Sequence, residues 1–169
     1  MSPGKLHPLT PTRKRILKFA LLSTLCHAHI AQAAPNCIAS CSKFESLSNY
    51  KKSTINLQEG TINLITFFSE SCPTCTHQFK EATCLEKNGF KIAHIGIGHQ
   101  KARLSSKLGG TVSSLGRYQM SLKQATKWQI VGTPYHWLFT EDRKIPLIGY
   151  HNCQSMIKIV HRIKSAKRG

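Results

Sequence analysis

The chain has 169 residues, of which 40% are hydrophobic, and it carries 24 Lys and Arg against 7 Asp and Glu, a formal net charge of +17. This hydrophobic content is sufficient for one core of ordinary size, which excludes a disordered or long-repeat protein. The excess of positive charge would attract nucleic acid, anionic lipid or acidic proteins.

Residues 1–33 have the pattern of a secretory signal peptide. Four basic residues between positions 13 and 18 precede a mostly apolar run, and the small residues at 31–33 offer a cleavage site. We expect a mature chain that begins near Ala34 and is exported to the periplasm. The alternative is an uncleaved leader that anchors the protein in a membrane, but the apolar run is interrupted by two histidines and is shorter than the ~20 residues that a span needs.

The cysteine count supports an oxidising compartment. Cleavage would remove the first of the seven cysteines and leave an even number, which in an exported chain predicts disulfides. The seven are Cys26, Cys37, Cys41, Cys72, Cys75, Cys84 and Cys153.

After the leader, residues 34–53 predict a short helical extension, and residues 54–169 predict one domain. The run at 53–68 contains two β-rich stretches, the second apolar enough to be buried on both faces, and it leads directly to Cys72. Pro73 suits the first turn of a helix, which we expect to continue to Asn88-Gly89.

The rest of the chain alternates in the same way. Residues 90–98 predict a buried strand, and the following basic, Gly- and Ser-rich stretch predicts a short helix running into a loop. Ser121 and Gln124 suit a capping box. Two short β runs around 135–150 predict a hairpin, and a C-terminal amphipathic helix follows. The order indicates an α/β fold with a partly parallel sheet, covered by helices on both faces and carrying an antiparallel edge.

Cys72 and Cys75 form a Cys-x-x-Cys motif at the start of the predicted helix. There, unpaired backbone N–H groups and the helix dipole stabilise a thiolate at the first sulfur. The second sulfur lies one turn deeper, so it can attack a mixed disulfide formed at the first sulfur and release the product. The pattern predicts a redox pair with Cys72 as the nucleophile and Cys75 as the resolving thiol.

Two other interpretations of the motif are weaker. A zinc site would need a second ligand pair, for which Cys37 and Cys41 are the only closely spaced candidates, and a Cys pair at the start of a long helix is atypical of zinc ribbons. A purely structural disulfide that closes so small a loop would remove little unfolded-state entropy. We therefore expect no metal and no bound cofactor.

The stretch "VGTPYHWLF" at residues 131–139 is a second signal, because Thr133-Pro134 entering a strand is consistent with a cis peptide bond. Here the sequence resembles the thioredoxin superfamily, in which a cis-proline loop packs against the Cys-x-x-Cys motif and presents backbone groups to the substrate. The resemblance covers about residues 54 to 165 and includes both motifs in order.

Within that superfamily, "INLITFFSESCPTCTHQF" and "RKIPLIGYHNCQSM" are most similar to periplasmic disulfide isomerases of the Dsb type and to the TrbB-like proteins of conjugative pilus assembly. The resemblance implies a thioredoxin-like fold, a substrate-binding loop at Thr133 and Pro134, and tuning of the redox potential by Pro73 and Thr74.

The sequence departs from the superfamily at several points. Thr66 and Ser71 stand where thioredoxin-type reductases carry a buried acid and a Trp, which weakens a reductase interpretation. The N-terminal dimerisation domain of the periplasmic isomerases is also missing, which places isomerase activity in a dimeric cleft in doubt.

The remaining cysteines, Cys37, Cys41, Cys84 and Cys153, allow three pairings. We favour structural disulfides that pin the N-terminal segment to the body of the domain, with a relay-type redox pair at Cys37 and Cys41 as the alternative.

Three histidines are candidates for functional groups. His77 and His136 are near the two motifs in sequence and could stabilise a thiolate as imidazolium, but we favour solvated or packed side chains. We expect His94 to be a satisfied interior residue of a core strand.

Together these patterns predict an exported thiol-disulfide oxidoreductase or isomerase. Its partners would be exported cysteine-containing proteins and a second protein that resets the redox pair. The alternatives are a periplasmic reductase for cytochrome, secretion or conjugation apparatus maturation and, from another class, a non-catalytic Cys-rich binding or scaffold protein. Nucleic-acid binding is not expected, because the positive residues are dispersed and no aromatic-basic stripe accompanies them.

Overall fold

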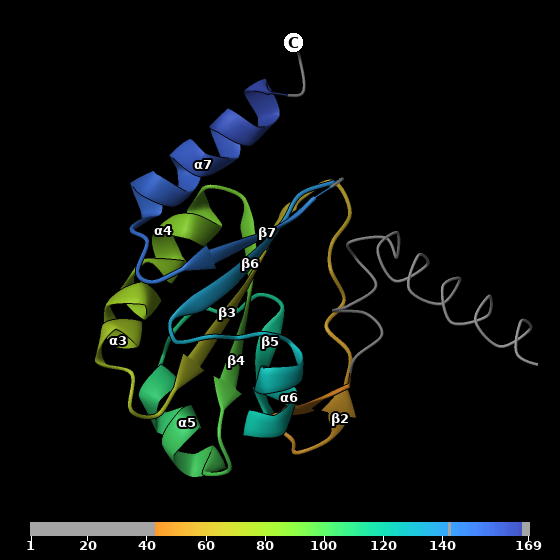
Figure 1. The fold of residues 1–169 in the computed structure, drawn as a ribbon, viewed down its shortest axis with the longest axis vertical. Helices are drawn as coiled ribbons and strands as arrows, with labels where there is room; N and C mark the ends of the chain where they lie inside the picture. Colours follow the sequence, from red (N-terminus) through yellow and green to blue (C-terminus); the bar gives the residue numbers. More distant parts are fainter. Residues whose placement is uncertain (1–42, 142, 167–169) are drawn as a thin grey trace, which may run out of the picture. The chain divides into compact units, whose positions relative to one another are not determined.

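The computed structural model describes residues 43–141 and 143–166, which form a seven-stranded sheet in the order β2-β1-β5-β4-β3-β6-β7 (Figure 1). Strands β3, β4 and β5 are parallel to one another, whereas β1, β6 and β7 pair antiparallel with their neighbours. The strands are β1 (Phe44–Ser46), β2 (Lys52–Ser53), β3 (Ile62–Ser69), β4 (Phe90–Ile97), β5 (Gly116–Met120), β6 (Tyr135–Phe139) and β7 (Lys144–Ile148).

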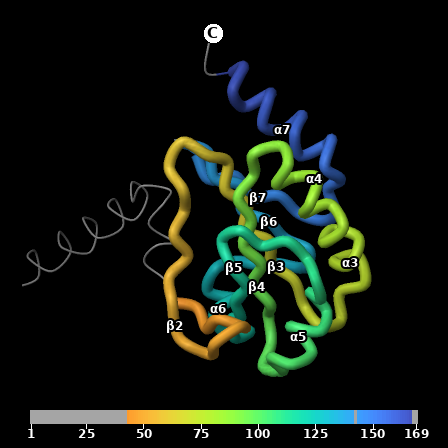
Figure 2. The backbone as a smooth tube through the Cα atoms, turned by 180° about the vertical axis from the view of Figure 1, so that it is seen from behind, coloured from red at the N-terminus to blue at the C-terminus, as the bar shows by residue number. Residues whose placement is uncertain are grey.

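Helices cover both faces of the sheet, as Figures 1 and 2 show from opposite sides. Four of them pack on one face and α6 packs on the other. The helices are α3 (Pro73–Lys80), α4 (Ala82–Lys87), α5 (Lys101–Leu108), α6 (Leu122–Lys127) and α7 (Cys153–Ser165). This mixed sheet between helical layers confirms the predicted α/β architecture.

The central strand β3 is buried on both faces, as its apolar run predicts. Ile65 and Phe67 belong to the core beneath α6, while Leu64 and Phe68 face the helices on the opposite side. All four are at most 1% exposed. Burial on both faces holds β3 in one register, and that register determines where Cys72 emerges.

Several local predictions are confirmed. Ser121 and Gln124 form the capping box of α6, with Ser121 Oγ accepting from Gln124 N and Gln124 Oε1 accepting from Ser121 N. Strands β6 and β7 form the expected antiparallel hairpin. The helix expected over residues 73–88 is instead divided into α3 and α4 at Glu81, whose backbone N–H bonds to Gln78 O and Phe79 O.

Strand β5 was not predicted, because its residues "GRYQM" alternate only weakly in polarity and begin with a glycine at φ 100°. Pairing along β4 supplies the hydrogen bonds that define β5. Backbone pairing with a neighbour is invisible to a local pattern.

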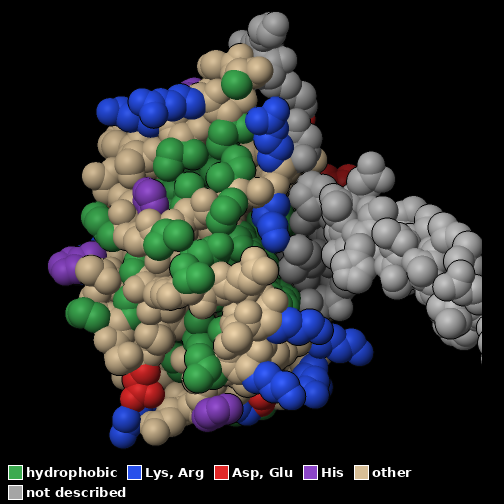
Figure 3. Space-filling view, in the orientation of Figure 1, with side chains coloured by type: hydrophobic (Ala, Val, Ile, Leu, Met, Phe, Trp, Pro, Cys, Tyr) green, Lys and Arg blue, Asp and Glu red, His purple; other side chains and the backbone are tan. Residues whose placement is uncertain are grey.

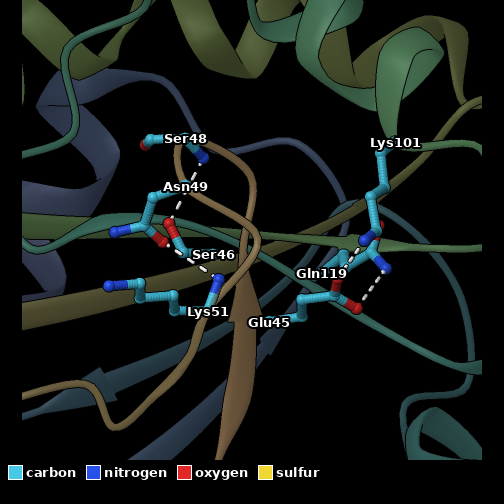
Figure 4. Close-up of polar contacts among 7 residues, drawn as sticks. All are labelled: Glu45, Ser46, Ser48, Asn49, Lys51, Lys101 and Gln119. Atoms are coloured by element: carbon cyan, nitrogen blue, oxygen red, sulfur yellow. Dashed lines mark hydrogen bonds and ion pairs between the residues drawn. The ribbon is translucent and has the colours of Figure 1, made fainter.

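The extension expected to be helical over 34–53 differs as well in its described part, residues 43–53, which contains β1 and β2. Phe44 is buried in the core, and Glu45 and Ser46 pair with β5. Figure 4 shows the intervening turn, in which Ser46 Oγ accepts from Ser48 N and Asn49 Oδ1 accepts from Lys51 N.

A disulfide joins Cys84 in α4 to Cys153 at the first position of α7. It connects two helices on one face of the sheet, so neither Cys84 nor Cys153 pins the N-terminal segment to the body of the domain, and that part of the expectation is wrong. Cys37 and Cys41, like the expected signal peptide, lie outside the described residues. None of the helices within residues 43–141 and 143–166 combines the length and hydropathy that crossing a membrane requires.

Candidate functional site

Cys72 is the N-cap of α3, and Pro73 and Cys75 lie in the first turn of that helix. Strand β3 ends three residues earlier, and the helix begins at the carboxyl ends of the parallel strands β3 and β4 (Figure 1). The Cys75 backbone N–H donates to Cys72 Sγ across 3.1 Å, and the two sulfurs are joined in a disulfide. The sulfur of Cys72 therefore occupies the positive end of the helix, where a thiolate is stabilised after reduction.

Both cysteines are buried, to slightly different degrees. Cys72 is 4% exposed and Cys75 is fully buried. An apolar cluster surrounds both, formed by Leu47 from the turn after β1, Phe68 from β3, Phe79 from α3, and Leu104 and Leu108 from α5. Both cysteines therefore lie in an apolar environment, and Cys75 is the more deeply buried of the two.

Pro73 and Thr74 lie between the two cysteines, in the first turn of α3. Pro73 occupies the first helical position, where its missing N–H costs no hydrogen bond. The Thr74 hydroxyl lies 3.7 Å from Cys72 Sγ, within hydrogen-bonding range for sulfur. A donor at this position can stabilise a thiolate on Cys72.

The Thr133-Pro134 peptide bond is cis, and it immediately precedes β6. Thr133 Oγ1 lies 3.0 Å from Ser69 Oγ, the last residue of β3. Pairing of β3 with β6 places Phe67 opposite Tyr135. The loop that carries Pro134 is therefore fastened beside the segment that leads into Cys72.

A row of polar side chains lies in the sheet beneath this region. One of them, Thr66, stands where thioredoxin-type reductases carry a buried acid. Thr66 pairs with His94 on β4 and with His136 on β6, so the three residues share one face of the sheet. Both histidines are at most 1% exposed. Burial lowers the pKa of each to about 3, which leaves both imidazoles neutral at physiological pH.

The hydrogen bonds of His136 define its tautomer. Its Nε2 lies 3.1 Å from Gly149 O, which can only accept, so Nε2 carries the proton. Its Nδ1 then accepts from Thr66 Oγ1 across 3.0 Å. His94 is likewise satisfied, through Ser113 Oγ at 2.7 Å. His94 is thus the interior residue that the sequence predicts, His136 belongs to the core, and His77 remains exposed on α3.

The connection from β7 to α7 is fastened to α3 by contacts that no sequence motif indicated. Gln78 exchanges two hydrogen bonds with the backbone of His151, and Glu81 accepts from Tyr150 Oη and from Cys153 N. Tyr150 is 45% exposed, and its ring lies 6.4 Å from that of His77. The sequence offered one signal of these contacts. It is Gln78, a polar residue on the otherwise apolar, buried face of α3.

The described residues contain no group of three or more His, Cys, Asp or Glu side chains that could hold a metal ion. Cys72 and Cys75 are bonded to each other, as are Cys84 and Cys153. The site therefore consists of the Cys72–Cys75 pair at a helix N-terminus, with a cis-proline loop beside it.

This arrangement of strands and helices is a thioredoxin-like fold. No protein-family profile matches the sequence, and no curated protein matches it. Solved structures do resemble it. DsbF of MTB has a TM-score of 0.60 at 9% sequence identity, over 73% of this chain and 96% of that one. A putative thiol:disulfide interchange protein DsbE from Chlorobium tepidum has a TM-score of 0.58 at 11% identity, over 74% and 92%.

A thioredoxin-like protein from Aeropyrum pernix is similar to a comparable degree, with a TM-score of 0.60 at 8% identity over 85% of this chain and 99% of that one. At such low identity these likenesses establish the thioredoxin-like fold, and they carry no information on the substrate.

Proposed function

We propose that this protein is an exported thiol-disulfide oxidoreductase that exchanges thiols and disulfides with cysteines of other exported proteins. The observation that carries the proposal is the position of Cys72 as the N-cap of α3, with its sulfur accepting the Cys75 N–H at 3.1 Å. This is the environment that lowers the pKa of a cysteine thiol and creates a nucleophile.

In the reductive direction, the Cys72 thiolate attacks one sulfur of a substrate disulfide and the other substrate sulfur leaves as a thiolate. The Cys75 thiolate then attacks the Cys72 sulfur of the mixed disulfide, which releases the second substrate thiolate and leaves Cys72–Cys75 oxidised. The substrate gains the two electrons that the pair loses. Oxidation of a substrate dithiol is the same sequence reversed.

In this proposal Thr133 and Pro134 bind the substrate backbone, while Pro73 and Thr74 tune the redox potential. Support for the loop comes from its attachment to Ser69, and support for tuning comes from the Thr74 hydroxyl beside the Cys72 sulfur. An isomerase of the Dsb or TrbB-like type is the finer form of the proposal. The neutral Thr66–His136 pair, in place of a buried acid, favours it over a thioredoxin-type reductase.

Export rests on the predicted signal peptide at residues 1–33 and on the presence of a second disulfide, which is typical of proteins in oxidising compartments. The solved structures of similar fold include a secreted Mycobacterium tuberculosis disulfide oxidoreductase described as homologous to E. coli DsbE. We propose a periplasmic location on these grounds, together with a second redox protein that resets the Cys72–Cys75 pair.

The test is a redox titration of the full chain in glutathione buffers, with alkylated thiols on Cys72 and Cys75 counted by mass spectrometry. A potential of roughly −120 to −180 mV would place the protein with oxidants and isomerases, and one near about −270 mV with reductases. A pair that never titrates would refute the redox proposal and leave the scaffold alternative. Insulin reduction also separates a redox protein from a scaffold, because a scaffold would show no activity.

A further inference from the structure

A second candidate site lies at the same end of the parallel strands as the Cys72–Cys75 pair. It is a pocket of about 330 Å³ beyond the carboxyl ends of β4 and β5. Because β3, β4 and β5 are parallel, their carboxyl ends lie on the same side, and β3 leads from there to Cys72. Side chains that line the pocket include Lys43, Glu45, Lys52, His99, Gln119 and Ser121.

The only acidic side chain among the described residues that line the pocket, Glu45, is already paired with a cation. One carboxylate oxygen of Glu45 forms an ion pair with Lys101, and the other accepts from Gln119 Nε2 at 3.0 Å (Figure 4). The hydrogen bond from Lys101 lowers the pKa of Glu45, so the carboxylate stays ionised. Glu45 therefore acts as a fixed acceptor, and the adjacent Lys101 offsets the repulsion that its charge would exert on an incoming anion.

The ionised carboxylate also fixes the orientation of the Gln119 amide. A carboxylate only accepts hydrogen bonds, so the NH₂ group of Gln119 must face Glu45. The opposite atom, Gln119 Oε1, is then buried and has no hydrogen-bond partner. A buried carbonyl oxygen without a donor is costly, and an occupant of the pocket that supplies an N–H would remove the cost.

The remaining charges of the pocket are positive. Within the described part of the chain, Lys43 and Lys52 form no ion pair, and both are exposed at the rim together with His99. Figure 3 shows Lys and Arg side chains gathered on the surface near β2 and α6. The pocket thus offers cations at its rim and, in its wall, a glutamine whose carbonyl oxygen is buried and unpaired.

We propose that this pocket binds an acidic segment of the polypeptide substrate. Asp or Glu side chains would pair with Lys43 and Lys52, and a backbone N–H of the same segment would donate to Gln119 Oε1. An ionised phosphate or carboxylate alone satisfies the lysines but brings no N–H, which is why a peptide fits better than a simple anion. The inference rests on the proposed function, because it assigns the substrate class of that site.

The spacing of the strands places the acidic segment relative to the target cysteine. Lys43 precedes β1 and Lys52 begins β2, and these strands are three and four positions from β3, which is about 14 to 19 Å across the sheet. An extended polypeptide covers that distance in roughly four to six residues. We therefore expect the acidic residues about four to six positions from the cysteine that reacts at Cys72.

Direct binding tests the pocket without any redox step. The probes are fluorescein-labelled peptides with Ser at the target position and a Glu-Asp pair about five and six residues away, on either side, each compared with its Gln-Asn counterpart. Fluorescence anisotropy with the full chain should show that one acidic peptide binds about tenfold more tightly than its counterpart, as expected for two partly exposed ion pairs.

The double substitution K43Q/K52Q should abolish that difference, and K43E/K52E should reverse it in favour of a Lys-Lys peptide. K158Q/K164Q on α7 removes the same charge outside the pocket and should have no effect. Q119M removes the unpaired carbonyl and should weaken the acidic and amide peptides alike. Equal binding of acidic and amide peptides, or equal losses in K43Q/K52Q and the control, would overturn the proposal.

Two further measurements separate this proposal from its neighbours. If insulin is reduced but acidic peptides have no advantage, the acidic-substrate inference fails while the oxidoreductase function stands. If acidic peptides bind through Lys43 and Lys52 but the Cys72–Cys75 pair never titrates, the pocket stands and the redox function fails. A single-stranded DNA oligonucleotide that binds more tightly than the acidic peptides at physiological salt, and depends on the same lysines, would replace the peptide as the ligand.

Discussion

The hydroxyl groups of Ser69 and Thr133 lie 3.0 Å apart and join the end of the strand that leads to the reactive cysteines to the residue before the cis-proline. These residues are separated by 64 positions in the sequence. The contact couples the placement of the proposed substrate loop to the strand that positions Cys72.

Substitution of Ser69 by Ala should therefore impair exchange more than folding. Loss of one hydrogen bond between hydroxyls is expected to cost about 0.5–1.5 kcal/mol in the free energy of unfolding. Because Thr133 loses its anchor, we expect KM for a peptide disulfide to rise with a smaller change in kcat. Stopped-flow fluorescence of peptide exchange and urea unfolding would measure the two effects.

Ser69→Thr keeps the hydroxyl and should restore KM, whereas Ser106→Ala, on the exposed side of α5, is the neutral control. If Ser69→Thr has the same KM as Ser69→Ala, the hydrogen bond has no role in positioning the loop.

The roles of the two sulfurs predict an asymmetry between their substitutions. Cys75→Ser leaves the nucleophile in place without a resolving thiol, so mixed disulfides should accumulate on Cys72. Cys72→Ser should trap few, since the remaining sulfur is fully buried. Non-reducing gel electrophoresis after incubation with a disulfide-containing peptide would count the trapped species, and comparable trapping by both variants would contradict the assigned roles.

The Cys84–Cys153 disulfide should contribute to stability and not to exchange. It closes a loop with a sequence separation of 69, for which loop-closure entropy gives about 4 kcal/mol. We expect C84A/C153A to lower the midpoint of guanidinium unfolding substantially and to leave the Cys72–Cys75 reduction potential unchanged. A large shift in that potential would instead indicate that the two disulfides exchange electrons.

Acid should destabilise the fold through its buried histidines. The pKa of His94 and of His136 is about 3 in the folded protein, against 6.5 ordinarily, so the unfolded state binds more protons at intermediate pH. Their contribution is complete above pH 6.5 and declines as the pH falls toward about 3, by up to about 1.4 kcal/mol per pH unit for each histidine. Urea unfolding at a series of pH values would measure this slope.

His94→Asn removes one of the two titrating groups and should reduce the slope between pH 6 and 4, whatever its effect on stability at pH 7. His161→Asn, at an exposed position of α7, is the matched control. An unchanged slope in His94→Asn would mean that this histidine is already protonated in the folded protein.

The parts of the fold that the sequence predicted are those that depend on local chemistry. The apolar run of β3, Pro73 at a helix start, and the Ser121–Gln124 capping box each satisfy their backbone requirements within a few residues. For the same reason, the Cys-x-x-Cys motif could be placed at a helix N-terminus before any long-range contact was known.

Features that require a partner from far along the chain could not be predicted. Strands β1 and β5 exist because each supplies hydrogen bonds to a neighbour, and neither has a strong pattern of its own. The pairing of Cys84 with Cys153 was one of three that the sequence allowed. The helical expectation for residues 44–53 failed because backbone pairing with β5 outweighs local helix preference.

The sequence by itself determined the class of chemistry that we propose, because two cysteines at that spacing after a buried strand favour a redox pair over a metal site or a structural disulfide. Only the tertiary structure decided what surrounds them. The neutral Thr66–His136 pair, the Ser69–Thr133 contact and the Gln119–Glu45 hydrogen bond each join segments distant in sequence. Their hydrogen bonds depend on sheet register, which is selected by burial of both faces of β3 and not by any short stretch of residues.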